Sequence, residues 1–224
     1  MDPVRVMVWN EYRCDREDPE AAALYPGGIH AAIADHLHAQ EGVVARTATL
    51  DEPEHGLTAE ALDHTDVLIW WAHRAHREVS DEVVERVASR VRGGMGLMVL
   101  HSGHYAKVLQ VLLGTSCRIQ WENNGGLERL WVVDPDHPVT AGVGPSFELP
   151  RTEMYGEPFV VPSPDEVLLI SWFESGQVFR SGCVWRRGDG KVFYFRPGHE
   201  TYAIYHDERV MRVITNAVYW LAGR

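Results

Sequence analysis

The sequence predicts an α/β fold, with a mainly parallel central sheet flanked by helices and antiparallel strands added in its second half. Three observations favour this fold. Short, continuously apolar runs alternate with amphipathic segments over residues 1–115, which is typical of parallel strands joined by helical crossovers. After residue 115 the long helices stop and strand-like runs follow one another. The length of 224 residues fits a single domain, 1–224, with a substantial core.

The first half contains four predicted strands and three predicted helices. Between residues 28 and 40 apolar residues recur every four positions, which indicates a helix. Ser80 can cap a second helix, whose valines form one face, and Ser102 can cap a third at 103–113. The acidic, polar segment 11–25 is predicted to be a loop. The predicted strands are 4–9, 43–50, 66–71 and 97–100.

The second half is predicted to add antiparallel strands and then to return to the main sheet. Gly188-Asp189-Gly190 is a hairpin turn signal between the last two strands. A closing helix is expected at 207–222, where apolar residues again share one side. The predicted strands are 127–133, 166–172, 177–185 and 191–195.

Charge and composition exclude several classes of protein. The net charge of -11 argues against broad attraction to nucleic acid or anionic membranes. No apolar run approaches the roughly 18 residues of a membrane helix, and the N-terminal segment lacks a signal-peptide pattern. The three cysteines are scattered and do not indicate a disulfide framework. We therefore expect a cytoplasmic protein with reduced thiols.

Polar residues follow the predicted strands at the points where a site is expected. Open parallel sheets bind ligands at the carboxyl ends of their strands. Glu11 follows the first strand, His73 the third and His101 the fourth, and the last strand leads into 196–200 (RPGHE). Because these strand ends meet at one edge of the sheet, we expect one shared site there.

Histidine spacing suggests a metal or acid–base role for this edge. His101 and His104 are three residues apart and could converge on one ion, and zinc accepts histidine together with carboxylate. His199 beside Glu200 can act as a general base or a ligand. His30 follows a Pro-Gly-Gly turn, and a packed core histidine is an equally good interpretation of it. His104 could simply be exposed.

Two glutamates in the later half are further candidates. Glu153 and Glu157 flank Tyr155 and are plausible ligand or acid–base groups, although solvated loop carboxylates are a common alternative. Most tryptophans should lie in the core. One or two exposed at the cleft would suit stacking on a sugar ring.

In seven sequence motifs the chain resembles the ThuA-like (trehalose utilisation) family. The matching stretches are VWNEYR (8–13), YPGGIH (25–30), WWAHRAH (70–76), VLHSGH (99–104), EMYGEPF (153–159), WFESGQVFRSGC (172–183) and FYFRPGHETY (193–202). The resemblance implies a flavodoxin-like fold similar to class I glutamine amidotransferases. It also implies zinc binding and a role in sugar catabolism beside an oxidoreductase that forms 3-keto sugars.

One departure from the amidotransferase pattern concerns the reactive group. That superfamily uses a cysteine at a strand-to-helix elbow, whereas the elbow here contains His101 and Ser102. Without a thiolate at this position, glutamine hydrolysis by the usual route is not expected.

The leading hypothesis is a metal-assisted enzyme that isomerises a 3-keto-disaccharide or keto-glycoside or cleaves it by β-elimination. A Ser102-dependent hydrolase and a non-catalytic sugar-binding or regulatory module are the alternatives. The cofactor is expected to be a divalent metal, with Zn²⁺ preferred, and the protein is expected to form a homo-oligomer. The predicted roles are catalytic for His199, Glu157, Ser102 and Glu200; substrate-binding for Glu11, His73, Tyr155, Glu153 and Arg196; and metal-binding for His30, His101 and His104.

Overall fold

The computed structural model describes residues 2–224, and Met1, with which the expected domain begins, lies outside the described residues. A nine-stranded sheet runs in the order β2-β1-β3-β4-β11-β10-β9-β6-β7. Neighbouring strands from β2 to β11 pair in parallel, which confirms the predicted parallel sheet. These strands are β1 (Val4–Asn10), β2 (Val43–Thr49), β3 (Val67–Trp71), β4 (Gly96–Leu100) and β11 (Gly190–Phe195).

The remaining strands of this sheet form an antiparallel extension. A tight turn joins β10 to β11, with Arg187 opposite Gly190, as the glycine signal predicted. β11 then pairs in parallel with β4, so the chain does return to the main sheet. The strands of the extension are β10 (Val178–Arg187), β9 (Glu166–Phe173), β6 (Glu128–Val132) and β7 (Ser146–Leu149).

A separate two-stranded ribbon lies beside the sheet. It pairs β5 (Gln120–Glu122) with β8 (Met154–Gly156) in antiparallel fashion. The sequence pattern predicts neither of these strands, nor β7, because each has only three or four residues and too few apolar positions to show a period.

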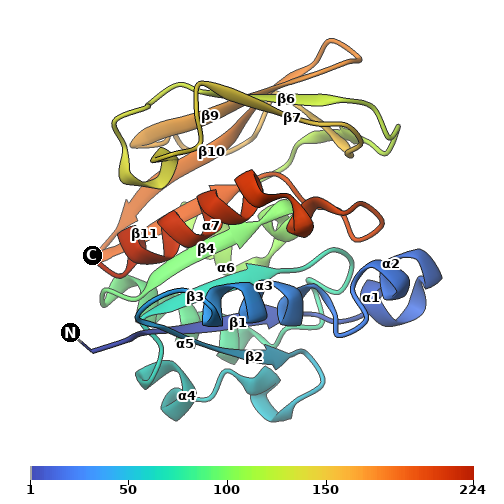
Figure 1. The fold of residues 1–224 in the computed structure, drawn as a ribbon. Helices are drawn as coiled ribbons and strands as arrows, with labels where there is room; N and C mark the ends of the chain where they lie inside the picture. The colour runs from blue at the N-terminus through green and yellow to red at the C-terminus, as the bar shows by residue number, and fades with distance from the viewer. Residues whose placement is uncertain (1) are drawn as a thin grey trace.

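Helices cover both faces of the parallel part (Figure 1). α3 (Ile29–His38) and α7 (Glu208–Leu221) pack on one face. α4 (Ala59–Asp63), α5 (Asp81–Arg92) and α6 (Lys107–Leu113) pack on the other. Burial on both faces explains why these strands are apolar at every position rather than at alternate ones.

Local signals account for two helix boundaries. Ser80 caps α5 as predicted, and its hydroxyl accepts a hydrogen bond from the amide of Val83 at 3.4 Å. The predicted helix at 103–113 instead begins as the 3-10 turn η2 (His101–Tyr105) and becomes α-helical at Lys107.

The prediction of a loop over residues 11–25 is wrong, because two short helices lie there. They are α1 (Cys14–Glu17) and α2 (Pro19–Leu24). The Asp18 side chain caps α2, and Pro19 occupies its first turn. Both residues are common at helix starts, and the low apolar content of the segment hid this signal.

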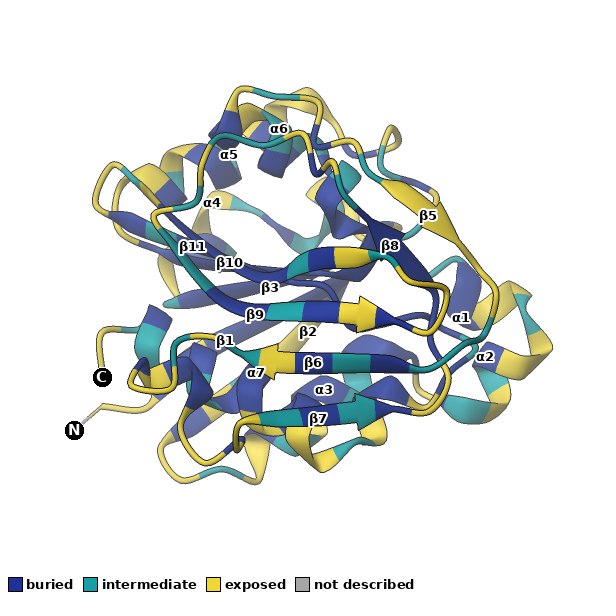
Figure 2. Ribbon diagram, turned by 90° about the horizontal axis from the view of Figure 1, so that it is seen from above, coloured by how far each residue is buried: buried dark blue, intermediate teal, exposed yellow. Residues whose placement is uncertain are grey.

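The carboxyl ends of the parallel strands meet at one edge, beside α1 and α2 (Figure 1). Two further 3-10 turns, η3 (Pro138–Thr140) and η4 (Ile204–His206), lie in the second half, and η1 (Pro53–Gly56) lies in the first. Seen from above, β5 is exposed over the same edge while the central strands beneath are buried (Figure 2). None of the helices in residues 2–224 is long and apolar enough to cross a bilayer.

Candidate active site

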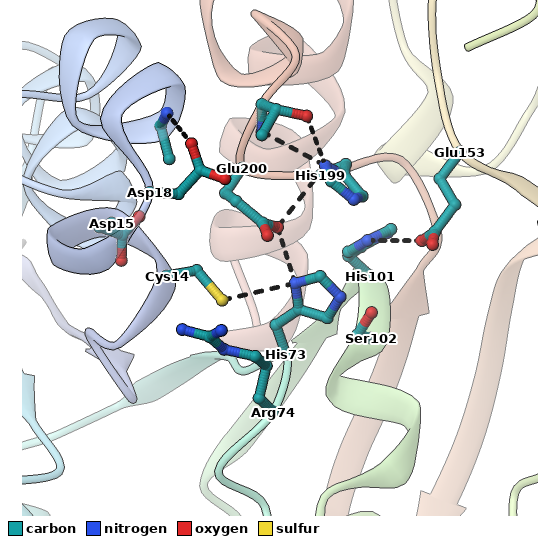
Figure 3. Close-up of polar contacts among 12 residues, drawn as sticks. Cys14, Asp15, Asp18, His73, Arg74, His101, Ser102, Glu153, His199 and Glu200 are labelled. Atoms are coloured by element: carbon teal, nitrogen blue, oxygen red, sulfur yellow. Dashed lines mark hydrogen bonds and ion pairs between the residues drawn. The ribbon is translucent and has the colours of Figure 1, made fainter. Parts of the chain in front are cut away.

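Histidines and a glutamate from the ends of three strands meet at this edge (Figure 3). His73 follows β3, His101 follows β4, and His199 and Glu200 follow β11. Glu153 joins them from the residue just before β8. The ring centroids of His73, His101 and His199 lie 5.3–5.9 Å from one another. The structure thus brings together five of the predicted site residues.

The outer pair consists of His73 and Glu200. Nδ1 of His73 lies 2.7 Å from Oε2 of Glu200, and the His73 side chain keeps 22% of its surface exposed. Burial alone would raise the pKa of Glu200, but the hydrogen bond and charge of His73 lower it to about 2. Burial likewise opposes a charge on His73, yet the bond to Glu200 outweighs it and raises the pKa of His73. This pair is therefore an ion pair near neutral pH.

The inner pair consists of His101 and Glu153, and it is more deeply buried. Nε2 of His101 lies 3.1 Å from Oε2 of Glu153. Nδ1 of the same ring faces the backbone carbonyl oxygen of Arg196 at 3.2 Å, which places the ring proton on Nδ1. Nε2 then presents a lone pair to the carboxylate. Consistently, Oε2 of Glu153 is buried and has no hydrogen-bond partner among the described residues.

Burial also sets the ionisation of the inner pair. It lowers the pKa of His101 well below its ordinary value, and the charges of His199 and His73 act in the same direction. It raises the pKa of Glu153, although the nearby cations oppose the rise. Two lone pairs facing each other in a buried site require a proton or a cation between or beside them.

The ring nitrogens of His199 are held by Asn123 and Thr201. The Tyr202 hydroxyl donates to Oδ1 of Asn123 at 2.6 Å, which turns the Asn123 amide nitrogen toward Nε2 of His199 at 3.3 Å. Nδ1 lies 3.0 Å from the Thr201 hydroxyl. Nδ1 also accepts a hydrogen bond from the Thr201 backbone amide at 3.3 Å, so both ring nitrogens face donors. Burial lowers the pKa of His199, which favours the neutral ring.

These side chains fit a divalent metal. One ligand atom from each of His73, Glu153 and His199 lies within 4.8 Å of the other two. Two imidazoles and one carboxylate are a common ligand set in catalytic zinc sites. The buried, unpaired Oε2 of Glu153 gives such an ion an anionic ligand, and the contact of His73 with Glu200 is the carboxylate–histidine arrangement found behind many metal ligands.

Cys14, His73 and Glu200 form a second group of the same size. Sγ of Cys14 lies 3.6 Å from Nδ1 of His73. Burial raises the pKa of the Cys14 thiol, with the charge of Glu200 as a further cause. A protonated thiol is a poor metal ligand, so the first group fits an ion better.

The predicted metal-binding set is not the set that the structure assembles. His101 borders the cluster, but His104 and His30 are held elsewhere. Nδ1 of His104 bonds the carbonyl oxygen of Cys117 at 2.8 Å, and burial lowers its pKa to about 3. Nδ1 of His30 accepts from the Asn10 amide at 3.0 Å, and its ring packs against Tyr12. Both rings have structural partners in place of a ligand role.

Two other predicted site residues, Glu11 and Arg196, hold the backbone around the site. Glu11 accepts hydrogen bonds from the amides of Arg74 and Ala75, each at 2.8 Å, and so fixes the loop that carries His73. Arg196 is 0% exposed and forms a buried ion pair with Glu128. It also donates to the carbonyl oxygen of Glu153 at 2.7 Å. Glu11 and Arg196 therefore hold the backbone that carries His73 and Glu153, and their predicted role in binding substrate stays a prediction.

Glu157 is turned away from the cluster. Its carboxylate pairs with Arg180, with Oε1 2.7 Å from Nε of that residue. The ion pair joins β10 to the segment after β8, which is a structural role. Which of the two glutamates reaches the site depends on how β8 pairs with β5 and on the contact of Glu157 with Arg180, and the sequence shows neither.

Ser102 and Tyr155 lie in the floor of the site. Their hydroxyl oxygens are 2.8 Å apart, and the Tyr155 ring stacks on His101. Among residues 2–224 no imidazole nitrogen lies within hydrogen-bonding distance of Ser102 Oγ. This geometry does not favour Ser102 as a histidine-activated nucleophile.

His101 occupies the elbow after β4 with a φ of 49°, which is uncommon for a residue other than glycine. A sharp strand-to-helix turn of this kind holds reactive groups in other α/β enzymes. Sequence reasoning missed Cys14, Asn123 and Tyr202 as neighbours of the site. Tyr202 lies in the matched 193–202 motif, whereas nothing in the sequence marked Asn123.

Comparisons with known proteins agree with this fold. A ThuA-like protein from Bacteroides uniformis is 18% identical, with a TM-score of 0.69, covering 98% of this chain and 92% of that one. A cytoplasmic protein from Salmonella typhimurium LT2 is 13% identical, with a TM-score of 0.63, covering 97% and 99%. PurLQS from Thermotoga maritima is 16% identical, with a TM-score of 0.54, covering 99% and 100%.

At these identities the solved structures show the fold alone, which is the flavodoxin-like, amidotransferase-like fold that the resemblance implied. No curated protein matches the chain. The family model for ThuA, described as trehalose utilisation, matches residues 5–221. Because the match covers nearly the whole sequence, the chain belongs to the ThuA family.

Proposed function

We propose that this ThuA-family protein is an enzyme that transfers a proton next to the ketone of a 3-keto-disaccharide or keto-glycoside, leading to isomerisation or β-elimination. The observation that supports this most strongly is that one ligand atom from each of His73, Glu153 and His199 lies within 4.8 Å of the other two, while Oε2 of Glu153 has no hydrogen-bond partner among the described residues. Family membership supports a sugar substrate.

His73, Glu153 and His199 would hold a divalent metal such as Zn²⁺, which acts as a Lewis acid on the ketone and its neighbouring hydroxyl. Glu200 keeps the His73 ring in place through Nδ1. Glu11 and Arg196 hold the backbone on which His73 and Glu153 are mounted. The chain thus fixes the ligand atoms before substrate arrives, which is the arrangement that catalysis needs.

His101 is the proton acceptor in this proposal. Its Nε2 carries a lone pair that faces the cluster, and its low pKa keeps the ring neutral at pH 7. This replaces the predicted bases: His199 is assigned to the metal, and Glu157 is bound by Arg180. A neutral imidazole at hydrogen-bonding distance from the reacting carbon can accept its proton.

The test is turnover of 3-keto-trehalose with and without EDTA, together with His101→Gln. EDTA should abolish turnover, and Zn²⁺ should restore it. His101→Gln should retain bound metal, measured by elemental analysis, but lose activity by roughly 100-fold or more, the usual range for a lost general base. Full activity of metal-free protein would reject the metal, and an active His101→Gln variant would reject the assigned base.

The rival proposal is a non-catalytic sugar-binding or regulatory module. Calorimetric binding of sugar without turnover would favour it. The enzyme proposal also requires a partner reaction, since an oxidoreductase must supply the ketone. We further propose a cytoplasmic location and a homo-oligomeric state. Light scattering of the purified protein tests the oligomeric state directly.

A further inference from the structure

We propose that Trp121, on the exposed ribbon strand β5, is the stacking platform for the second sugar ring of the substrate. Trp121 is 59% exposed, more than any other large hydrophobic residue in the described part of the chain. Tryptophan is usually buried because its large apolar surface is poorly solvated. Exposure alone is common for a single aromatic residue, but an indole beside a polar site can stack on the apolar face of a sugar. This inference rests on the proposed function and specifies where the substrate lies.

Strand pairing places Trp121 on the same side of the ribbon as the site. Trp121 lies directly opposite Tyr155 in the β5–β8 pairing. Directly opposed residues of an antiparallel pair project to the same face. The Tyr155 side chain points into the site, where it contacts Ser102 and His101. The Trp121 side chain therefore leaves the ribbon on that face, further out.

The contact of Asn123 supports the same orientation. Asn123 follows β5, two residues after Trp121, and residues two apart on a strand share a face. Its amide nitrogen lies 3.3 Å from Nε2 of His199. The rim thus runs from His199 through Asn123 to Trp121. Two residues along a strand span about 6.6 Å, which is comparable with the width of one pyranose ring.

This spacing suggests how the two rings of a disaccharide would bind. A keto ring placed at His73 and His199 would leave its neighbouring ring above β5, where the indole face can stack on the apolar face of a sugar. Asn123, two residues after Trp121 on the same face, supplies an amide group for a sugar hydroxyl. The platform would favour disaccharides and glycosides with a ring-shaped second group over keto-monosaccharides.

The first test is kinetic, with the complete protein loaded with Zn²⁺. Trp121→Ala should raise KM for 3-keto-trehalose by about three- to tenfold, the range of one aromatic contact, with kcat unchanged. The kcat/KM for 3-keto-glucose should not change. Trp121→Phe should restore most of the loss. Trp131→Ala is the matched control, because Trp131 is 45% exposed on β6 in the extension and stacks with Arg129. An unchanged KM in Trp121→Ala, or an equal effect on 3-keto-glucose, would overturn the proposal.

The second test separates this inference from the proposed chemistry. Trehalose is titrated while tryptophan fluorescence is recorded, which needs no turnover. A change seen in wild type and in Trp131→Phe, but lost in Trp121→Phe, supports the platform even if 3-keto-trehalose is not a substrate. A change that persists in Trp121→Phe, or no change in wild type, overturns it. If Trp121→Ala instead breaks an oligomer in light scattering and leaves KM unaltered, the tryptophan belongs to a subunit interface and the proposal fails.

Discussion

The outer pair and the inner pair contain the same two chemical groups, an imidazole and a carboxylate, yet they hold charge differently. In the outer pair the His73 ring turns Nδ1 toward Glu200, and both groups are ionised. In the inner pair the proton of His101 is used on the carbonyl oxygen of Arg196, so a lone pair faces Glu153. The two pairs differ because the His73 ring turns a protonated nitrogen toward its carboxylate, whereas the His101 ring turns an unprotonated one. Only the first carboxylate therefore receives a hydrogen bond from its histidine. Glu153 of the inner pair is thus left, within the described part of the chain, without a hydrogen-bond donor for its Oε2.

Of the variants considered, Glu153→Gln should change the difference between the inner and outer pairs most, because it gives the inner pair a hydrogen-bond donor. The amide can donate to Nε2 of His101, so the buried acceptor gains a partner and the free energy of unfolding should rise by about 1–3 kcal/mol. Metal binding should weaken at least about 100-fold, because an anionic ligand is lost. Thermal denaturation and metal titration of the same sample measure both effects.

Glu157→Gln is the control for that experiment, because Glu157 lies four residues away and pairs with Arg180. It should leave metal affinity unchanged. If Glu153→Gln binds Zn²⁺ as tightly as wild type, Glu153 is not a metal ligand and the proposed set of His73, Glu153 and His199 is wrong.

Glu200→Gln tests the outer pair, because it removes the charge that faces His73. The carboxylate contacts His73 but is not one of the three proposed ligands, so metal affinity should fall by about 10- to 100-fold and no more. The pKa of His73 should also fall, since the bond and charge of Glu200 raise it. NMR titration of the imidazole protons in metal-free protein measures this shift.

The same variant should change the acid stability of the protein. Glu200 has a folded pKa of about 2, below the value of about 4.3 in an unfolded chain. Its stabilisation is therefore present above pH 4.3 and is lost as the pH falls toward 2. Wild type and Glu200→Gln should differ most in stability at neutral pH and converge in strong acid. Glu17→Gln, at an exposed ion pair with Arg74, serves as control.

Within residues 2–224 His30 has no carboxylate partner, so it isolates the effect of burial from that of carboxylate pairing. Burial lowers its pKa to about 4, below the roughly 6.5 of an unfolded histidine. Its contribution to stability is present above pH 6.5 and declines as the pH falls to 4, with a slope of about 1.4 kcal/mol per pH unit. His30→Gln keeps a side-chain acceptor for Asn10 and should flatten the pH dependence of unfolding by that slope.

The control here is His38→Gln, at an exposed histidine of the same helix, which should leave the slope unaltered. A metal affinity that falls in His30→Gln would revive the original prediction that His30 is a ligand, and would contradict the site described above.

The parallel half of the fold was predictable because burial on both faces makes its strands apolar throughout. The same regularity located the site, since His73, His101, His199 and Glu200 follow strands whose carboxyl ends share an edge. The elbow at His101 followed from this pattern as well. These are local signals combined with one topological rule.

Side-chain orientation could not be predicted in the same way. His104 and His30 look as suitable as His101 in the sequence, but their ring nitrogens bond Cys117 and Asn10. Glu153 and Glu157 differ only through the pairing of β8 with β5, and β5 shows no periodic pattern. From the sequence Arg196 is expected to bind substrate, but its side chain is buried and pairs with Glu128 of β6, in the antiparallel extension. Each of these outcomes depends on partners distant in the chain.

The ion pair between Arg196 and Glu128 has a consequence for how the molecule opens. Glu128 belongs to the antiparallel extension, whereas Arg196 holds His101 and Glu153. Separating two such groups strands a charge in the interior, at about 3–5 kcal/mol. Local fluctuations that peel β6 away must therefore also release the elbow, so amide protons of β6 and of β4 should exchange with solvent as one cooperative unit. Loosening of the antiparallel extension at one end of the sheet is thus transmitted to β4 in its middle, where His101 begins the elbow.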